Sequence, residues 1–298
     1  MKKQTVVIAL AALATSGAFA QANDTLAKIK ASGSISLGVR DSSALSFTLG
    51  NGKYVGFHTE MAERVIDDLS KAAGKKLNIT YTPVTSQNRI PLVQNGTVDL
   101  ECGSTTNNAT RQKDVDFAFT TYVEVVRMAV RADSNVNELK DLNGKTVVTT
   151  TGTTSVQTLR KNERAQGIDF KEVMGKDHAD SFLLLESGRA DAFVMDGSIL
   201  AANISKAKNP AGFKIVGPEL SVEPIACMLR KGDDAFKKAV NDSIARQIKD
   251  GSLAKLYDKW FLQPIPPTNT ALNLPMSDAT KAAWANPNTK PMEDYATK

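Results

Sequence analysis

The sequence is poor in the residues that most often carry catalysis and metal binding. Its 298 residues include only two histidines and two cysteines, and aromatic residues make up 6%. His58 and His178 lie far apart in the chain, and neither forms a ligand-spaced cluster with a cysteine. We therefore expect neither a bound metal nor another cofactor.

The chain also lacks a large charge excess and, beyond its first residues, a long apolar run. It has 37 Lys and Arg against 32 Asp and Glu, a formal net charge of +5. This excess is too weak and too dispersed to indicate a nucleic-acid-binding protein. No later segment approaches ~18 uninterrupted apolar residues, so the mature chain is expected to be soluble.

The N-terminal segment "MKKQTVVIALAALATSGAFA" is the exception. It begins with basic residues, continues with a short apolar run, and ends with the small residues Ala18 and Ala20 around a phenylalanine. This pattern is typical of a cleaved secretory signal, and the segment is too short to span a membrane. Cleavage after Ala20 and cleavage after Ala22 both agree with the pattern. We assign residues 1–22 to the signal peptide and expect the mature protein to be exported.

Cys102 and Cys227 are the only cysteines in the sequence. An exported protein meets oxidants, so an even pair favours a disulfide. Such a bond closes a long loop and stabilises the fold by restricting the unfolded chain. Two buried thiols are the alternative.

Hydrophobic periodicity predicts alternating strands and helices. Residues 34–40 alternate as in a half-buried strand, apolar residues recur at helical spacing from Phe57 until Gly74, and residues 77–84 form a second strand. This alternation favours an α/β fold with a parallel sheet. Without its signal the chain has about 278 residues, more than one core usually holds, so two domains are expected.

An internal repeat supports two similar lobes. The segments "LVQNGTVDLECGS" (92–104) and "LLESGRADAFVMD" (184–196) align without gaps. Each reads as a helix end, a glycine, a strand and a terminal polar residue. A chance similarity between two strand and helix units is the alternative. The coinciding pairs are Gly96 with Gly188, Asp99 with Asp191, and Ser104 with Asp196.

Two long extended runs, 122–133 and 221–233, flank the second half of the chain. If the segment between them is a lobe inserted into the first one, the chain crosses between the lobes twice and forms a two-strand hinge. We expect lobe 1 to comprise residues 23–125 and 221–298, and lobe 2 residues 126–220. Both cysteines then belong to lobe 1.

Polar residues at the expected strand ends predict the ligand site. In open parallel sheets, ligands bind beyond the carboxyl ends of the strands. Arg40, Arg89 and Arg111 lie at such ends with one carboxylate, Asp196, so three arginines against one carboxylate give +2. His178 is able to add positive charge, although a lone histidine is usually structural. A single arginine more often lies on the solvated surface, but together these residues favour a ligand with more carboxylates than ammonium groups.

The segment "TTTGTTS" supplies a second anion site. Gly152 permits a tight turn, and a helix is expected to begin just after it. Backbone N–H groups at a helix N-terminus attract a carboxylate, so we expect Thr153 and Thr154 to contact the ligand. A helix cap without ligand binding is the alternative.

Several of these segments resemble those of periplasmic glutamate/aspartate-binding proteins, in the polar amino-acid branch of the bacterial solute-binding protein family 3. They include "TSQNRIPLVQNGTVDLECGSTTNNATRQ", "KDHADSF", "LESGRADAFVMD" and "DKWFLQPIPP". The resemblance extends over nearly the whole mature chain. It implies a two-lobed, class II periplasmic binding fold, in which each lobe is a mostly parallel sheet flanked by helices and the lobes are joined by a two-strand hinge.

The resemblance also implies a function. The chain would capture L-glutamate and L-aspartate between closing lobes and deliver them to a membrane ABC-transporter permease, as a monomer in the periplasm and without catalysis. One alternative is an enzyme of the wider family, similar to a dehydratase, acting on a small amino or carboxylic acid. Another is the sensing domain of a receptor, which would need a membrane span or a further domain that we do not expect in this chain.

Roles are implied for the residues that match by position. Arg111 with Thr106 and Thr154 would hold the ligand's α-carboxylate. Asp196 with Ser104 would hold its ammonium group. The residues expected to hold the side-chain carboxylate are Arg40, Ser86, Arg89 and His178.

Overall fold

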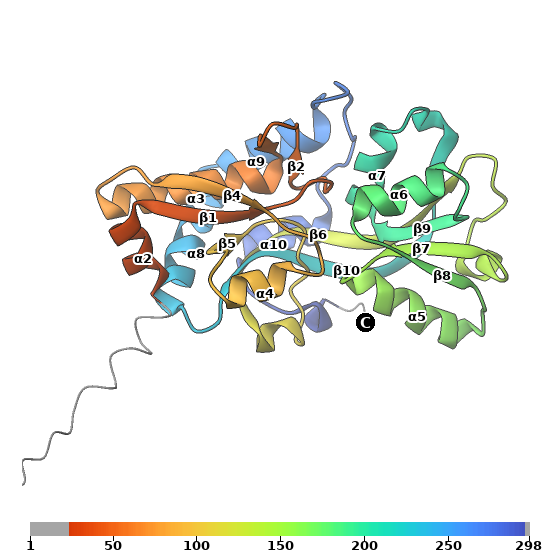
Figure 1. Ribbon diagram of the computed structural model, residues 1–298, viewed down its shortest axis with the longest axis horizontal. Helices are drawn as coiled ribbons and strands as arrows, with labels where there is room; N and C mark the ends of the chain where they lie inside the picture. The colour runs from red at the N-terminus through yellow and green to blue at the C-terminus, as the bar shows by residue number, and fades with distance from the viewer. Residues whose placement is uncertain (1–23, 296–298) are drawn as a thin grey trace, which may run out of the picture.

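A computed structural model describes residues 24–295, so the predicted signal segment, 1–22, lies outside the described residues. Figure 1 shows two α/β lobes side by side, connected by the long strands β6 (Val115–Arg131) and β10 (Phe213–Arg230). We call the lobe that contains the N-terminal strands lobe 1 and the other lobe 2. Within the described part of the chain, no helix is long and apolar enough to cross a membrane.

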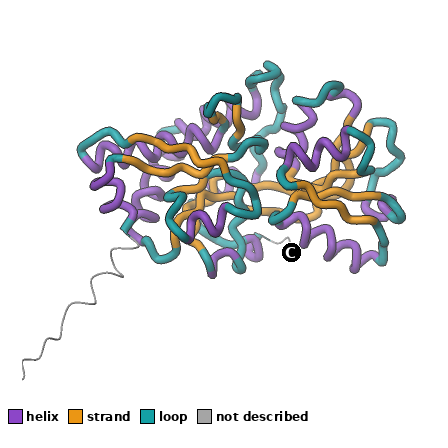
Figure 2. Tube along the Cα trace, viewed as in Figure 1, coloured by secondary structure: helices purple, strands orange, loops and turns teal. Residues whose placement is uncertain are grey.

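Strands and helices alternate along each lobe, as Figure 2 shows. The predicted helix that starts at Phe57 ends at Gly74, which has a positive φ of 70°. Lobe 1 contains α2 (Thr25–Ser32), β1 (Ser34–Val39), β2 (Phe47–Thr48), β3 (Tyr54–Val55), α3 (Phe57–Ala73), β4 (Asn78–Pro83), α4 (Arg89–Gln94), β5 (Leu100–Glu101), α8 (Asp234–Lys249), α9 (Ser252–Tyr257) and α10 (Asp278–Ala285). Lobe 2 contains β7 (Thr146–Thr150), α5 (Thr154–Gln166), β8 (Lys171–Gly175), α6 (His178–Glu186), β9 (Ala192–Asp196) and α7 (Gly197–Ser205).

One hydrogen-bonded sheet runs through both lobes, in the order β4-β1-β5-β10-β6-β9-β7-β8. In lobe 1, β1 pairs in parallel with β4 and β5. In lobe 2, β7 pairs in parallel with β8 and β9. The antiparallel pair of β6 and β10 lies between these two groups and belongs to both lobes. The prediction of mostly parallel lobes joined by two extended strands is confirmed.

The internal repeat is a structural repeat. Asp99 precedes β5 and its Oδ2 accepts a hydrogen bond from the backbone N–H of Ser36 in β1, at 3.0 Å. Asp191 precedes β9 and its Oδ2 accepts from the N–H of Thr146 in β7, at 2.9 Å. Each aspartate thus binds the beginning of the parallel neighbouring strand. The two units therefore share one mode of strand docking, which a chance sequence similarity would not produce.

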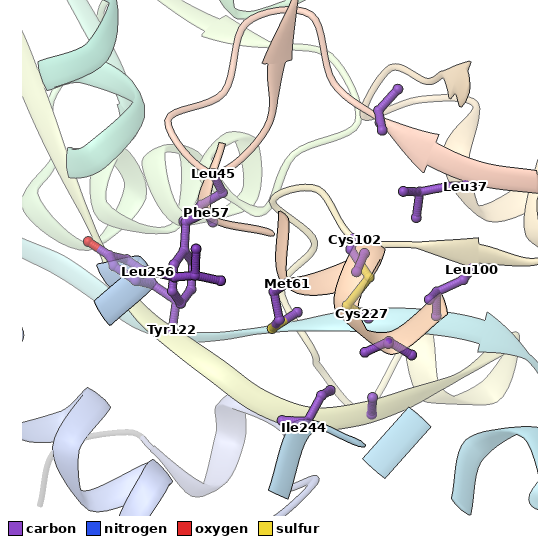
Figure 3. Close-up of a cluster of buried hydrophobic side chains, with 14 of the residues drawn as sticks. Leu37, Leu45, Phe57, Met61, Leu100, Cys102, Tyr122, Cys227, Ile244 and Leu256 are labelled. Carbon is purple, nitrogen blue, oxygen red and sulfur yellow. A yellow bond between two sulfur atoms is a disulfide. The ribbon is translucent and has the colours of Figure 1, made fainter. Parts of the chain in front are cut away.

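Each lobe has its own hydrophobic core on the two faces of the sheet. In lobe 1, α3 buries Phe57 and Met61 against the sheet, and Figure 3 shows Phe57 near Tyr122 of β6. Phe261 packs with ring centroids 5.6 Å from Phe57 and 5.3 Å from Tyr122. This aromatic cluster fixes the first part of β6 within lobe 1.

The C-terminal segment returns to the same strand. Thr280 in α10 accepts a hydrogen bond from the backbone N–H of Val123, at 3.0 Å. The indole N–H of Trp284 donates to the carbonyl oxygen of Thr121, at 2.9 Å. The segment after the prolines therefore packs against β6 just before the chain passes into lobe 2.

The Cys102–Cys227 disulfide is formed, with 4.3 Å between the two Cα atoms. It joins the end of β5 to β10 inside the lobe 1 core (Figure 3). The disulfide prediction is confirmed, and the alternative of two free thiols is wrong. The two residues are 125 positions apart, so the closed loop contains all of lobe 2.

Replacing both cysteines with alanine should lower the free energy of unfolding by about 2 to 5 kcal/mol, because the unfolded chain gains the freedom that a long closed loop denies it. Urea denaturation of the wild type and the double variant measures the change. Wild-type protein in reductant is the control and should approach the variant. An unchanged midpoint in both samples would contradict the prediction.

Candidate functional site

Arg40 and Arg89 converge on one residue of lobe 1. Arg40 follows β1 and donates from Nη1 to the hydroxyl of Ser104, at 3.2 Å. Arg89 begins α4 and donates from Nη1 to the carbonyl oxygen of Ser104, at 3.0 Å. Burial, and after it the positive charge of Arg89, lower the pKa of Arg40 to about 10. Both groups remain charged at neutral pH, so two buried cations lie together where an anion would bind.

Arg40 also reaches lobe 2. Its Nη2 lies 3.1 Å from the Ser86 hydroxyl and 3.0 Å from Nε2 of His178. Because a guanidinium group only donates, Nε2 must accept, and Nδ1 carries the proton that it donates to the Thr150 hydroxyl at 3.1 Å. Burial and the neighbouring arginines hold the pKa of His178 well below its usual range. His178 therefore adds no positive charge here, and its neutral ring orients Arg40 instead.

Arg111 also connects the two lobes. Its Nη1 donates to the carbonyl oxygen of Thr106 in lobe 1, at 2.9 Å, and its Nη2 to that of Gly152 in lobe 2, at 3.2 Å. Burial lowers the pKa of Arg111 to about 9, and the charge of Arg89 also contributes. This guanidinium group therefore forms a second cationic position, distinct from the pair at Ser104.

The N-terminus of α5 lies beside Arg111. Thr153 precedes the helix, but its hydroxyl donates to the carbonyl oxygen of Thr150, at 2.7 Å, and does not cap the helix. Helix caps satisfy N–H groups that otherwise need another partner. The expected threonine cap is therefore not formed, and the free N–H groups of this helix terminus suit an anion.

Asp196 ends β9 and begins α7, and its side chain is buried. Its Oδ1 has no hydrogen-bond partner among the described residues, and neither has Nε of Arg89. Burial raises the pKa of Asp196 well above its usual range, and the charges of Glu124 and Glu223 raise it further. An unpartnered buried carboxyl group is costly, so Asp196 is ready to accept a cationic donor.

Three further carboxyl groups are buried at the site: Glu101 of β5, Glu124 of β6 and Glu223 of β10. Glu124 and Glu223 lie directly opposite each other on the two connecting strands. Together with Asp196, the carboxyl groups outnumber the three arginines by one. The count of +2 from the sequence is therefore wrong, because it left out these three glutamates. Glu124 and Glu223 lie within the long connecting strands, and Glu101 is the last residue of β5. A glutamate inside an apolar run, as in "YVEVV", is the signal that could have found them.

Glu124 is held by the start of α7 in lobe 2. Its carboxyl oxygens accept from the hydroxyl of Ser198, from the Ser198 N–H at 3.3 Å, and from the Val125 N–H at 3.1 Å. Burial raises the pKa of Glu124 to about 7, although these hydrogen bonds oppose the shift. This group therefore titrates near neutral pH in the folded protein.

The lobes also meet away from these charges. The Nζ atom of Lys206, after α7, lies 4.2 Å from the ring centroid of Phe47 in lobe 1, a cation–π contact. Gly152 has a φ of +80°, and a Cβ atom there would lie 2.8 Å from the backbone N and Cα of Gln87 in lobe 1. The structure is thus a closed form in which the lobes touch.

The structure brings the predicted residues together at the contact between the lobes. Hydrogen bonds join one group around Ser104, and another around Thr106 that includes Glu223. Asp196 is coupled to both groups by charge. In residues 24–295, no group of three or more His, Cys, Asp or Glu side chains is arranged to hold a metal. The members of the first group are Arg40, Ser86, Arg89, Ser104 and His178, and those of the second are Thr106, Arg111 and Thr154.

Comparison with known proteins gives similarity over most of the chain. The profile of the bacterial extracellular solute-binding proteins, family 3, matches residues 35–263. An L-glutamate/L-aspartate-binding protein of Pseudomonas aeruginosa is 45% identical over 272 residues, which cover 90% of each chain. A glutamate/aspartate import solute-binding protein of Escherichia coli is 42% identical over 299 residues, covering 97% of this chain and 99% of that protein.

Solved structures share the two-lobed fold. A mutant of ArgBP from T. maritima has a TM-score of 0.70 at 27% identity, covering 79% of this chain and 98% of that chain. An ancestral amino acid-binding protein, described as a precursor of cyclohexadienyl dehydratase, has a TM-score of 0.69 at 29% identity, covering 80% and 99%.

The buried Glu124 should make the stability of the unliganded protein depend on pH. The ordinary pKa of a glutamate is 4.5 and the folded-state value is about 7. Between these values the folded protein holds a proton that the unfolded chain has lost, so stability falls as the pH rises through about 7. Glu124→Gln removes this contribution. The fall in unfolding midpoint from pH 5.5 to pH 8 should therefore be smaller in the variant.

Differential scanning calorimetry of both proteins in matched buffers provides the measurement. The difference between the two pH profiles gives the contribution of Glu124 to stability separately from that of the buried histidines. The histidines change stability with pH in the opposite direction, because burial lowers the pKa of His58 to about 4. Parallel profiles for wild type and variant would show that Glu124 is ionised throughout this range.

Proposed function

The chain belongs to the bacterial extracellular solute-binding proteins of family 3, and we propose that it captures L-glutamate and L-aspartate between its two lobes and delivers them to a membrane ABC-transporter permease. Two relatives that match nearly the whole chain are named for glutamate and aspartate. The site must then hold two carboxylates and one ammonium group. Its described residues offer two separate cationic positions and a buried carboxyl group.

The observation that carries the proposal is the separation of the cationic positions. Arg40 and Arg89 meet at Ser104, whereas Arg111 binds the carbonyl oxygens of Thr106 and Gly152. A neutral amino acid has one carboxylate and needs one such position. A dicarboxylic amino acid uses both, and each buried carboxylate then has charged hydrogen-bond donors.

The roles follow from this arrangement. Arg111, which also binds the backbone carbonyl oxygen of Thr106, and the backbone N–H groups of the α5 N-terminus at Thr153 and Thr154 bind the α-carboxylate. Asp196 and Ser104 bind the ammonium group. The side-chain carboxylate is bound at the other cationic position, where His178 orients one of the arginines. The residues of that position are Arg40, Ser86, Arg89 and His178.

Transport requires only that binding favours the closed form. The ligand contacts both lobes, so its binding free energy shifts the population toward closure, and the permease recognises the closed protein. We propose that the protein acts in the periplasm as a monomer, after export directed by residues 1–22, and without a cofactor or nucleic acid. The lobes proposed for this motion are residues 23–125 with 221–298, and residues 126–220.

The two histidines do not support the catalytic alternative. Elimination from a small acid needs a general acid or base free to meet the substrate. Both ring nitrogens of His178 are engaged, one with Arg40 and the other with Thr150. His58 is bound by Gly103 and Thr121 within lobe 1.

Thermal-shift measurements with twenty amino acids test the proposed function. Glutamate and aspartate should raise the unfolding midpoint most, since a ligand at 100 times its dissociation constant stabilises by about 2.7 kcal/mol. Arg40→Met should then cost about 2 to 5 kcal/mol of glutamate binding, because a buried carboxylate loses its partner. The same substitution should reduce the binding free energy of glutamine much less, because the glutamine amide carries no charge.

Arg111→Met is the matched control, because both ligands share the α-carboxylate and should lose affinity alike. Calorimetric titration of each variant with glutamate and with glutamine gives the four affinity losses to compare. The function is refuted if neither acidic amino acid stabilises the wild type while a neutral or basic one does. Equal losses for glutamate and glutamine in Arg40→Met would remove Arg40 from the side-chain position.

Gly152→Ala should weaken glutamate binding at least about 10-fold, because the added methyl group meets the backbone of Gln87 only when the lobes are closed. Gly144→Ala is the control. Gly144 has a similar φ of +72°, but a Cβ atom there meets nothing within 4 Å. Both variants bear the cost of a left-handed alanine, about 1 to 2 kcal/mol. Isothermal titration should find the affinity loss in the first variant alone, and similar affinities in both would contradict closure at Gly152.

A further inference from the structure

Glu223 lies where the two lobes are joined. It is fully buried in β10, directly opposite Glu124 of β6. Its Oε2 accepts hydrogen bonds from the hydroxyls of Thr106 and Thr154, each at 2.6 Å. Thr106 belongs to lobe 1 and Thr154 is the first residue of α5 in lobe 2. A single carboxylate oxygen therefore holds one hydroxyl from each lobe.

These hydrogen bonds decide what the two hydroxyls can offer to a ligand. A hydroxyl group has one proton, and each threonine directs it to Glu223. The two hydroxyl oxygens are 3.4 Å apart, so their mutual contact is much weaker than the contact with Glu223. Their lone pairs remain available on the side away from Glu223. Both hydroxyls are thereby fixed as acceptors, which match an N–H donor and not a carboxylate.

The other carboxylate oxygen of Glu223 is also hydrogen bonded. Oε1 accepts from the hydroxyl of Ser221, at 2.7 Å, two residues earlier on the same strand. The carboxylate therefore has a hydrogen-bond donor on each oxygen, and its orientation is set by three hydroxyl groups. A group held in this way orders its neighbours without needing to touch the ligand.

An acceptor-rich region adjoins these hydroxyls. Asp196 pairs with Val126 of β6, two residues along the same face from Glu124. Glu124 in turn lies opposite Glu223, so three carboxyl groups gather at this end of the site. Arg40, Arg89 and Arg111 are cations whose charge interacts with that of Asp196, and the phenol of Tyr122 is a further titratable group there. The unpartnered Oδ1 of Asp196 belongs to this region.

We propose that Glu223 is a positioning residue for ammonium recognition, which holds Thr106 and Thr154 as acceptors so that the ammonium group of a bound amino acid is shared by both lobes. The inference rests on the proposed function only in requiring an amino acid as ligand. The α-carboxylate is then left to Arg111 and the backbone of the α5 N-terminus. The roles implied by resemblance for the two threonine hydroxyls change from donors to acceptors.

The test compares glutamate with glutarate, which has the same two carboxylates and no ammonium group. Glu223→Gln keeps the shape of the side chain but introduces an amide N–H₂ beside the two hydroxyls. Affinity for glutamate should fall about 10- to 100-fold, the loss typical of a charged hydrogen-bond network, and affinity for glutarate should stay constant or rise. Isothermal titration gives the affinity for glutamate. Competition against labelled glutamate gives the affinity for glutarate, even when glutarate binds weakly.

Glu124→Gln is the matched control, since it removes a carboxyl group at the same hinge position without contact to either threonine. Its glutamate affinity should change less than that of Glu223→Gln. Equal losses in the two variants would mean that only total charge matters, and would overturn the proposal. Equal losses for glutamate and glutarate in Glu223→Gln would also overturn it, because they indicate a general structural role.

Thr106→Val and Thr154→Val test the same point if Glu223→Gln does not fold, which circular dichroism establishes. Each substitution should weaken glutamate binding and leave glutarate binding unchanged. A loss of glutarate affinity as large as the loss of glutamate affinity, or larger, would overturn the proposal. If the wild type ignores glutamate and aspartate, the proposed function fails separately. The amino acid found by thermal shift and its deaminated analogue then decide the role of Glu223 by the same comparison.

Discussion

The burial of three arginine side chains between two lobes is the constraint on which the rest of the structure depends. A buried guanidinium group is stable only when it is hydrogen bonded and its charge is balanced. Arg40 finds Ser104 in lobe 1 and His178 in lobe 2, and Arg111 finds carbonyl oxygens on both sides. Closing the lobes and satisfying the charges are thus the same event. A ligand that supplies carboxylates at these positions strengthens the closed form.

The two lobes are separately packed units connected by β6 and β10. Each lobe has its own core, and lobe 1 is further fixed by the disulfide and by the packing of α10 on β6. The sheet of the described residues passes between the lobes through β6 and β10 (Figure 1). Glu124 and Glu223 lie opposite each other on these two strands. Both carboxyl groups have hydrogen-bond partners in lobe 2: Glu124 binds Ser198 at the start of α7, and Glu223 binds Thr154 as well as Thr106 of lobe 1.

Much of the fold was predictable because local patterns agreed with the tertiary structure. The helix from Phe57 ends where Gly74 adopts a positive φ, and the repeat placed Asp99 and Asp191 at equivalent strand starts. The strand ends also identified the arginines, because carboxyl ends of parallel strands meet at one edge of a sheet. Glu223 was missed because it lies within an extended run. The charge state of His178 was left open by the sequence, because its burial beside Arg40 is evident only in three dimensions.

The sequence by itself determined the alternation of strands and helices, the two similar lobes, the disulfide pair and the three cationic residues of the site. These features depend on periodicity, on turn residues and on residue chemistry, which act over short distances along the chain. Only the tertiary structure decided the direction of each hydrogen bond, the charge of each buried group and the pairing of Glu223 with a threonine from each lobe. The physical reason is that protonation and donor direction depend on burial and on neighbours far away in the sequence, such as Thr154 at 69 and Thr106 at 117 positions from Glu223, which no local pattern encodes.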